Sequence, residues 1–149
     1  MVVTQLLNNE QKGGFTHKVV LTHADLTETT ANTAQTIEIL TVELGSRVSE
    51  ASYILKTDFE DASDVNLNAT VLEVGDDTDP NRYIVSKELN TNGTEIQAWS
   101  TANDVNTVPY TYLTADTIDA VIGSMAAKSL SDIDTGEVWI YLNVVHLGR

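Results

Sequence analysis

The sequence predicts an all-β fold, a single-domain antiparallel β-sandwich or jelly roll that carries an extended N-terminal arm. Threonine accounts for 20 of the 149 residues, and with valine, isoleucine and tyrosine it suits a pleated sheet better than a helix. Roughly eight short stretches with strand character follow one another with turns between them, which favours a sandwich over a βαβ fold. The length fits one domain, which we place at residues 15–149 behind an arm at residues 1–14.

The arm divides into an apolar half and a polar half that ends at Gly13-Gly14. The apolar half contains Val2, Val3, Leu6 and Leu7. A glycine pair loosens the backbone, so the arm can take a direction independent of the domain, and its apolar side chains then need a partner surface. The alternative is that the segment folds back onto its own domain.

The first predicted strand is 15–23, because apolar and polar side chains alternate along it. The polar, threonine-rich segment 24–35 follows as a loop or a weak edge strand. Two more strands are expected at 36–44 and 47–57. The short connection between them, near Gly45-Ser46, predicts that they form a hairpin.

The clearest local signal further along the chain is Asn92-Gly93. It comes after an acidic connection at 58–68 and a short strand at 69–74. The Asn-Gly dipeptide supports the positive φ angles of a type I′ turn, so it predicts a two-residue hairpin. The resulting register would place Leu89 opposite Ile96.

Two short strands are expected at 110–113 and 117–122. The second could instead be a helix capped by Thr114 or Asp116. Its β-branched residues and the interruption at Gly123 favour the strand. One helical turn is expected at 129–134, directly before the final strand.

The final strand, 137–147, has two apolar faces. Val138, Ile140, Leu142 and Val144 make one face, while Trp139 and Tyr141 lie on the other. Because successive strand side chains point to opposite sides, such a strand needs cover on both sides. The sequence therefore favours a component of a protein assembly over an enzyme.

The charge of the chain restricts its partners. Eight Lys and Arg stand against 22 Asp and Glu, which gives a net charge of −14. This charge repels phosphate backbones and anionic lipids, so neither nucleic acid nor a membrane is expected as a partner. The absence of cysteine excludes disulfides and thiolate zinc sites. The first residues lack the pattern of a secretory signal, so synthesis in the cytoplasm is expected.

One acidic segment has the oxygen-ligand spacing of a calcium loop. Asp77, Asp79, Asn81 and Glu88 match the first, third, fifth and twelfth positions of an EF-hand loop. Arg82, however, stands where that loop needs glycine, and Glu88 falls in a predicted strand. We therefore favour a solvated acidic turn and keep calcium binding as the alternative.

No arrangement of residues predicts catalysis or a cofactor. His17 and His23 lie six residues apart, which is about 20 Å in an extended strand and too far to share one metal ion. His146 has no evident partners, and the sequence contains no nucleophile motif of the GxSxG type. We therefore expect no enzyme, no cofactor and no metal site.

Several segments share their pattern of strands and acidic turns with a known class of proteins. They are TIEIL at 36–40, DFED at 58–61, VGDD at 74–77 leading to Arg82-Tyr83, LTADTID at 113–119 and TGEV at 135–138. This combination resembles the small β-rich virion structural proteins of tailed bacteriophages. The resemblance covers roughly residues 34–142 and consists of β turns rather than a chemical signature.

The resemblance implies a capsid cement or decoration protein. Such a protein sits on the outer capsid surface of the virion, often as a homotrimer, and braces neighbouring major capsid subunits. Its partner here would be the major capsid protein of a phage, and it would be made in the host cytoplasm. The residues expected at the capsid or subunit interface are Val2, Val3, Leu6, Leu7, Trp139 and Tyr141.

A receptor- or carbohydrate-binding module of a phage fibre or tail is the alternative function. Aromatic side chains in exposed loops would favour it, and Trp99 and the segment 110–112 are the candidates. A tail or head-completion component is a further alternative.

Overall fold

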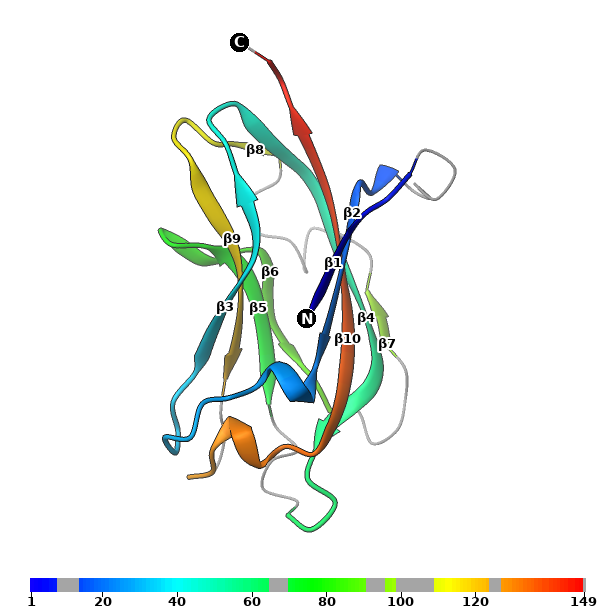
Figure 1. Cartoon of the computed structure of the whole chain (residues 1–149), viewed down its shortest axis with the longest axis vertical. Coiled ribbons are helices and arrows are strands. Elements are labelled where there is room, and N and C mark those ends of the chain that lie inside the picture. Colours follow the sequence, from blue (N-terminus) through cyan, green and yellow to red (C-terminus); the bar gives the residue numbers. More distant parts are fainter. Residues whose placement is uncertain (8–13, 65–69, 91–95, 99–108, 124–126, 149) are drawn as a thin grey trace.

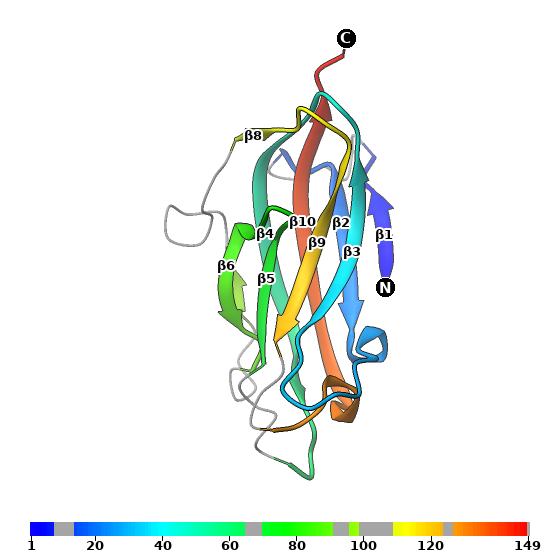
Figure 2. The ribbon, with the colours of Figure 1, turned by 90° about the vertical axis from the view of Figure 1, so that its left-hand side faces the viewer.

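The chain folds into two antiparallel β-sheets that pack face to face, seen from two directions in Figures 1 and 2. The computed structural model describes residues 1–7, 14–64, 70–90, 96–98, 109–123 and 127–148, with the backbone alone at 96–98. This architecture confirms the predicted all-β sandwich.

Sheet A has six strands. They are β1 (Val2–Gln5), β2 (His17–Thr22), β10 (Thr135–His146), β4 (Ser46–Glu60) and β7 (Ile96–Ala98) in that order, with β8 (Tyr110–Thr111) also paired to β4. The last strand of the chain, β10, thus lies at the centre of the sheet, between β2 and β4.

Sheet B has four strands. They are β3 (Gln35–Val42), β9 (Asp116–Gly123), β5 (Val71–Asp76) and β6 (Asp79–Glu88) in that order. The segment 117–122 is therefore a strand, as predicted, and not the alternative helix. A 3-10 turn at Leu130–Asp132 confirms the helical turn expected before the final strand, and a second one at His23–Asp25 follows β2.

The core lies between the two sheets. Val138, Ile140 and Leu142 of β10 have no exposed surface, and Val144 packs against the same cluster, which confirms the predicted inner face of this strand. Val19 and Leu21 on β2 are equally buried. The largest side chains with almost no exposed surface include Phe59, Tyr83, Tyr112, Leu55, Leu72, Ile118 and Ile122.

The hairpin predicted between 36–44 and 47–57 is wrong, although both strands exist. β3 pairs with β9 in sheet B, whereas β4 pairs with β10, β7 and β8 in sheet A. The connection is tight, with the Ser46 N–H donating to the Glu43 carbonyl at 2.9 Å. It is an arch between the sheets. The two strands bury more apolar surface when their apolar faces meet across the core than when the strands lie side by side in one sheet.

The hairpin predicted around Asn92-Gly93 is also wrong. The turn itself lies outside the described residues, but β7 pairs with β4 and not with β6, so Leu89 does not face Ile96. Leu89 instead bonds to Thr70, which precedes β5, and to Phe59 on β4: its N–H donates to the Thr70 carbonyl at 2.7 Å, and its carbonyl accepts from the Phe59 N–H at 2.8 Å. These bonds and the complete burial of Leu89 end β6 and direct the chain across the sandwich.

Gly136 determines how β10 begins. Its φ angle is +141°, and a Cβ atom at this position would lie 2.5 Å from the ring of Phe59. The pairing of β10 with β4 shifts register on either side of Glu137, so the strand enters the sheet through a bulge. Only glycine combines this backbone conformation with such close contact to a core ring.

Candidate interaction surfaces

The N-terminal segment is the outermost strand of sheet A. β1 pairs antiparallel with β2, from Val2 opposite Val20 to Gln5 opposite His17. Leu6 continues the contact by donating its N–H to the Thr16 carbonyl at 2.7 Å, and the Met1 amino group pairs with Asp25. Residues 1–7 therefore lie on their own domain, which is the alternative to an arm that reaches a partner surface.

The apolar side chains of residues 1–7 remain largely uncovered. Val2, Val3 and Leu7 are 60%, 40% and 66% exposed, respectively, while Leu6 is half-buried. The backbone ladder holds β1 in place, but burial of apolar surface contributes little to its position. The N-terminal segment thus leaves apolar surface exposed at the outer edge of sheet A.

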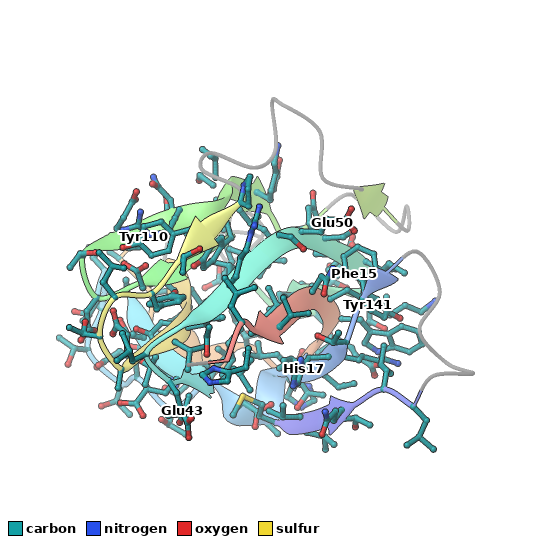
Figure 3. All side chains as sticks on the ribbon, turned by 90° about the horizontal axis from the view of Figure 1, so that it is seen from above. Phe15, His17, Glu43, Glu50, Tyr110 and Tyr141 are labelled. Atoms are coloured by element: carbon teal, nitrogen blue, oxygen red, sulfur yellow. The ribbon has the colours of Figure 1, made fainter. Side chains whose placement is uncertain are left out.

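Trp139 and Tyr141 lie on the outer side of sheet A, as predicted, and both are half-buried. Trp139 stands opposite Val20 on one side and Ile54 on the other. The Phe15 and Tyr141 rings have centroids 5.7 Å apart, and Figure 3 shows the two side chains next to one another. Side chains of the same chain thus bury part of the outer face of β10.

Two lysines complete the surface around Trp139. The Lys18 Nζ lies 3.1 Å from the centroid of the Trp139 ring, and the Lys56 Nζ lies 4.9 Å from it. Partial burial, together with the neighbouring ammonium of Lys56, lowers the pKa of Lys18, while Glu137 opposes this shift. We name this surface the Trp139 face; its members are Lys18, Val20, Ile54, Lys56, Trp139 and Tyr141.

A third apolar surface lies at one end of the sandwich, where the β3–β4 turn, the β8–β9 turn and the end of β10 meet at the top of Figure 1. Backbone bonds hold these segments together: the Gly45 N–H donates to the Tyr112 carbonyl at 2.9 Å, and the Leu147 N–H donates to the Gly45 carbonyl at 3.0 Å. We name it the apolar tip; it consists of Leu113 (81% exposed), Leu147 (57%), Leu44 (54%) and Val145 (40%).

Sequence reasoning missed the apolar tip. Leu44 stands alone between Glu43 and Gly45, and Leu113 lies next to a threonine in another turn. A large apolar residue at the polar apex of a turn is the signal that could have found it, since turn positions are usually polar. These two turns come together because of the arch between the sheets. The sequence did not predict that arch.

The acidic segment after β5 forms an ion pair in place of a calcium loop. Asp77 and Thr78 connect β5 to β6, so Asp79 stands opposite Asp76 while Glu88 stands opposite Val71 at the far end of the hairpin. The calcium alternative is therefore wrong, because its first and last ligands lie at opposite ends of an extended strand. Among the described residues, no group of three or more His, Asp or Glu is placed to hold a metal ion.

Asp76 is the centre of a polar network behind this turn. Arg82 donates to it from Nε at 2.5 Å, and Thr78 donates from its hydroxyl at 2.7 Å. Burial opposes the charge of Asp76, but these hydrogen bonds outweigh it and lower the pKa of the carboxyl. The Arg82 guanidinium also stacks on the Tyr110 ring, 3.9 Å from its centroid.

Asp119 is a buried acid on the outer side of sheet B. It is 3% exposed, and its Oδ1 has no hydrogen-bond partner within the described part of the chain. Burial raises the pKa of this carboxyl, and the nearby charges of Asp77, Glu38 and Asp116 raise it further. The Glu38 side chain is exposed directly opposite on β3, so like charges face one another across these strands.

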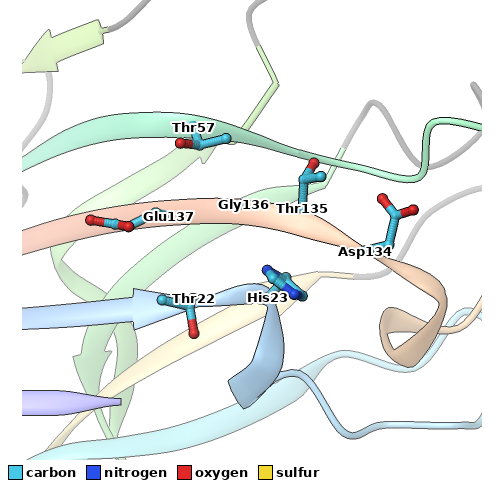
Figure 4. A pocket seen from close by; sticks show the side chains of 7 residues that line it. All are labelled: Thr22, His23, Thr57, Asp134, Thr135, Gly136 and Glu137. Carbon is cyan, nitrogen blue, oxygen red and sulfur yellow. The ribbon is translucent and has the colours of Figure 1, made fainter.

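An open pocket of about 340 Å³ lies beside the start of β10, as Figure 4 shows. Its lining residues are Thr22, His23, Thr57, Asp134, Thr135, Gly136 and Glu137. Glu137 accepts a hydrogen bond from the Trp139 indole at 2.5 Å, so the pocket adjoins the Trp139 face. The lining brings a histidine, two carboxylates and three threonine hydroxyls into one open hollow.

The remaining candidate residues from the sequence are two histidines and several aromatic side chains, and the described ones do not form a site. His17 begins β2, whereas His23 follows its other end. Of the aromatic candidates for a receptor site, Tyr112 is only 2% exposed and Tyr110 is half-buried against Arg82, so neither offers an exposed ring. Trp99 lies outside the described residues. No described helix is long and apolar enough to span a membrane.

The comparisons with known proteins yield a likeness of fold. No protein-family model matches the sequence, and no curated protein matches it. Among solved structures, the chain is similar to one described as part of the cyanophage Pam1 capsid asymmetric unit, with a TM-score of 0.58 and 19% sequence identity. The similarity covers 88% of this chain and 82% of that chain, so it extends over the sandwich as a whole.

Proposed function

We propose that this protein is a non-enzymatic structural protein of a phage virion, a decoration protein that binds the outer capsid surface. There it stabilises contacts between major capsid subunits. The observation that carries the proposal is the likeness of the whole sandwich to a chain of the cyanophage Pam1 capsid asymmetric unit. At 19% identity this likeness concerns the fold, so the step from fold to function depends on the surfaces of the molecule.

Those surfaces have the character of an assembly component. Large apolar side chains lie exposed on β1 and at the apolar tip, and an aromatic pair lies half-buried on sheet A. Contiguous exposed apolar surface on a soluble domain is typical of an interface with another protein. The proposed interface residues of the N-terminal segment and β10 are Val2, Val3, Leu6, Leu7, Trp139 and Tyr141.

The remaining parts of the proposal follow from charge and thermodynamics. A net charge of −14 keeps the protein away from packaged nucleic acid and from anionic membranes, and so favours the outer surface. A subunit that binds only the assembled lattice stabilises that lattice by mass action. We further propose that the protein acts as a homotrimer, since decorating subunits at a junction of capsid proteins meet several identical neighbours.

The test is co-sedimentation of the purified protein with undecorated capsids, together with thermal denaturation of the resulting particles. We expect the protein to pellet with the capsids and to raise their melting temperature. Sedimentation velocity of the free protein would give its oligomeric state. Capsids that bind no protein, or bind it without any gain in stability, would contradict the proposal.

Two surface variants would locate the interface. Leu44→Ser with Leu113→Ser alters the apolar tip, and Val2→Ser with Leu7→Ser alters the N-terminal segment. Both pairs are exposed, so folding should be preserved. Val85→Ser, a half-buried position on β6, serves as the matched control. Loss of capsid binding in one surface variant, with binding retained in the control, would identify the contacting face.

A further inference from the structure

The Trp139 face carries positive charge on a strongly acidic protein. Lys18 and Lys56 come from different strands, β2 and β4, yet their ammonium groups lie 3.1 and 4.9 Å from the centroid of one indole ring. The whole chain has only eight Lys and Arg, and two others, Arg82 and Lys128, form ion pairs with carboxylates elsewhere. The fold therefore brings scarce positive charge together on this face.

Bringing two ammonium groups to one ring has an energetic cost. Each is attracted by the face of the indole, but the two repel one another, and partial burial adds to the cost for Lys18. Glu137 offsets part of the repulsion at Lys18, and it also accepts the Trp139 indole hydrogen bond. A further carboxylate placed over this pair would gain from both ammonium groups at once.

Apolar side chains lie beside the lysine pair in a single row. Val20 and Ile54 flank Trp139 on the neighbouring strands, and Val2 of β1 extends the row beyond Val20. Val2 is 60% exposed, and the other three are half-buried. The row crosses four adjacent strands of sheet A, so it offers an apolar strip alongside a positive centre.

We propose that the Trp139 face binds an acidic segment of a partner protein, with a carboxylate placed between Lys18 and Lys56 and aliphatic side chains along the apolar row. The argument is charge complementarity: the net charge of the molecule repels an acidic partner, whereas the two ammonium groups of the Trp139 face attract one. We assign the acidic segment to the capsid surface that the protein contacts, and this assignment rests on the proposed function.

A peptide titration tests the recognition without any capsid. In a Trp99→Phe background Trp139 is the sole indole, because the chain has two tryptophans. An alternating Glu-Leu octapeptide should change Trp139 fluorescence saturably at low salt, and a Lys-Leu octapeptide should not. Lys18→Gln with Lys56→Gln should weaken Glu-Leu binding by about tenfold, whereas Lys87→Gln on β6 should leave it unchanged.

Capsid co-sedimentation with the same variants separates the two proposals. If Glu-Leu peptide binding depends on Lys18 and Lys56 but wild-type protein does not bind capsids, the acidic-segment inference stands and the decoration role fails. If wild-type protein binds capsids while the peptide does not bind, or binds the lysine variant equally well, the inference is overturned and the decoration role stands. A change of oligomeric state in the lysine variant alone would assign the face to a second copy of this chain and overturn the capsid assignment.

Discussion

The Tyr83 hydroxyl donates a hydrogen bond to the Tyr112 hydroxyl at 2.7 Å, inside the sandwich. Tyr83 belongs to β6 of sheet B, whereas Tyr112 follows β8 and donates its N–H to the Ser46 carbonyl of sheet A. The Tyr112 hydroxyl in turn donates to Asp76 Oδ2 at 3.3 Å. Burial raises the pKa of both phenols, so they remain neutral donors in a polar connection between the two sheets.

Tyr112→Phe should therefore destabilise the fold by about 1–3 kcal/mol, because it leaves the buried Tyr83 hydroxyl without its acceptor and removes a donor to Asp76. The double variant Tyr83→Phe with Tyr112→Phe should cost less than the sum of the two single variants. Urea unfolding measures all three. Tyr110→Phe is the control, since it keeps the ring over Arg82. Additive single and double effects would show that the two hydroxyls act independently.

The Arg82–Asp76 pair predicts acid sensitivity. The carboxyl pKa is lowered in the folded state, so its contribution to stability is present above the unfolded pKa of about 4 and is lost as the pH falls through the folded pKa. Arg82→Met should cost about 3 kcal/mol or more at neutral pH, because it leaves a buried carboxylate without its cation. Thermal melts from pH 7 to pH 2 would show this loss.

A matched variant completes the test of this pair. Asp76→Asn with Arg82→Met should recover part of the lost stability, because neither partner is then charged. Its melting temperature should also depend less on pH below 4 than that of the wild type. If Arg82→Met proves as stable as the wild type, the ion pair contributes nothing to the fold.

Asp119 has the opposite dependence on pH. Burial raises its pKa in the folded state, so the folded protein takes up a proton before the unfolded chain does, and stability rises as the pH falls from neutral through the folded pKa. Asp119→Asn should stabilise the protein at pH 7 by about 1 kcal/mol. Chemical denaturation at pH 7 and pH 5 measures the effect.

The control for Asp119 is Glu88→Gln, which removes one negative charge at an exposed position on β6. Its effect should be within about 0.5 kcal/mol at both pH values. Equal stabilisation by the two variants would assign the gain to net charge, and a loss of stability in Asp119→Asn would show that the buried carboxylate is needed.

Gly136→Ala should be among the most destabilising single substitutions in the chain, at about 4 kcal/mol or more. The new methyl would lie 2.5 Å from the Phe59 ring, at a φ angle of +141°. Gly148→Ala is the control: its φ is also positive, at +78°, but no atom lies within 4 Å of the added Cβ. Expression level and melting temperature distinguish the two, and similar effects would exclude the ring contact as the cause.

Local pattern predicted the strands of this protein better than their partners. The alternation along 15–23 and along β10 comes from the requirement that one side of a strand face the core. It can be recognised within the few residues of the strand itself. Pairing depends on distant residues. Asn92-Gly93 carries a real turn preference, but the bonds of Leu89 to Thr70 and Phe59 direct the end of β6 elsewhere, and no local pattern reports them.

The candidate surfaces show the same division. The position of Trp139 opposite the core follows from strand parity alone, so the sequence placed it correctly. Lys18 and Lys56 are 38 residues apart in the chain, and only the pairing of β10 with both β2 and β4 brings them to one ring. The turns that carry Leu44 and Leu113 likewise come together only because an arch connects the two sheets.

The position of β10 also determines when sheet A can be completed during synthesis. Sheet A joins residues 17–22 to residues 137–142, and the strand between β2 and β4 is translated after every other described strand. Until it emerges from the ribosome, β2 and β4 have no common neighbour, and their apolar faces have no strand to complete the core. A chain that ends before residue 135 therefore lacks the strand that joins β2 to β4, and we expect it to stay unfolded.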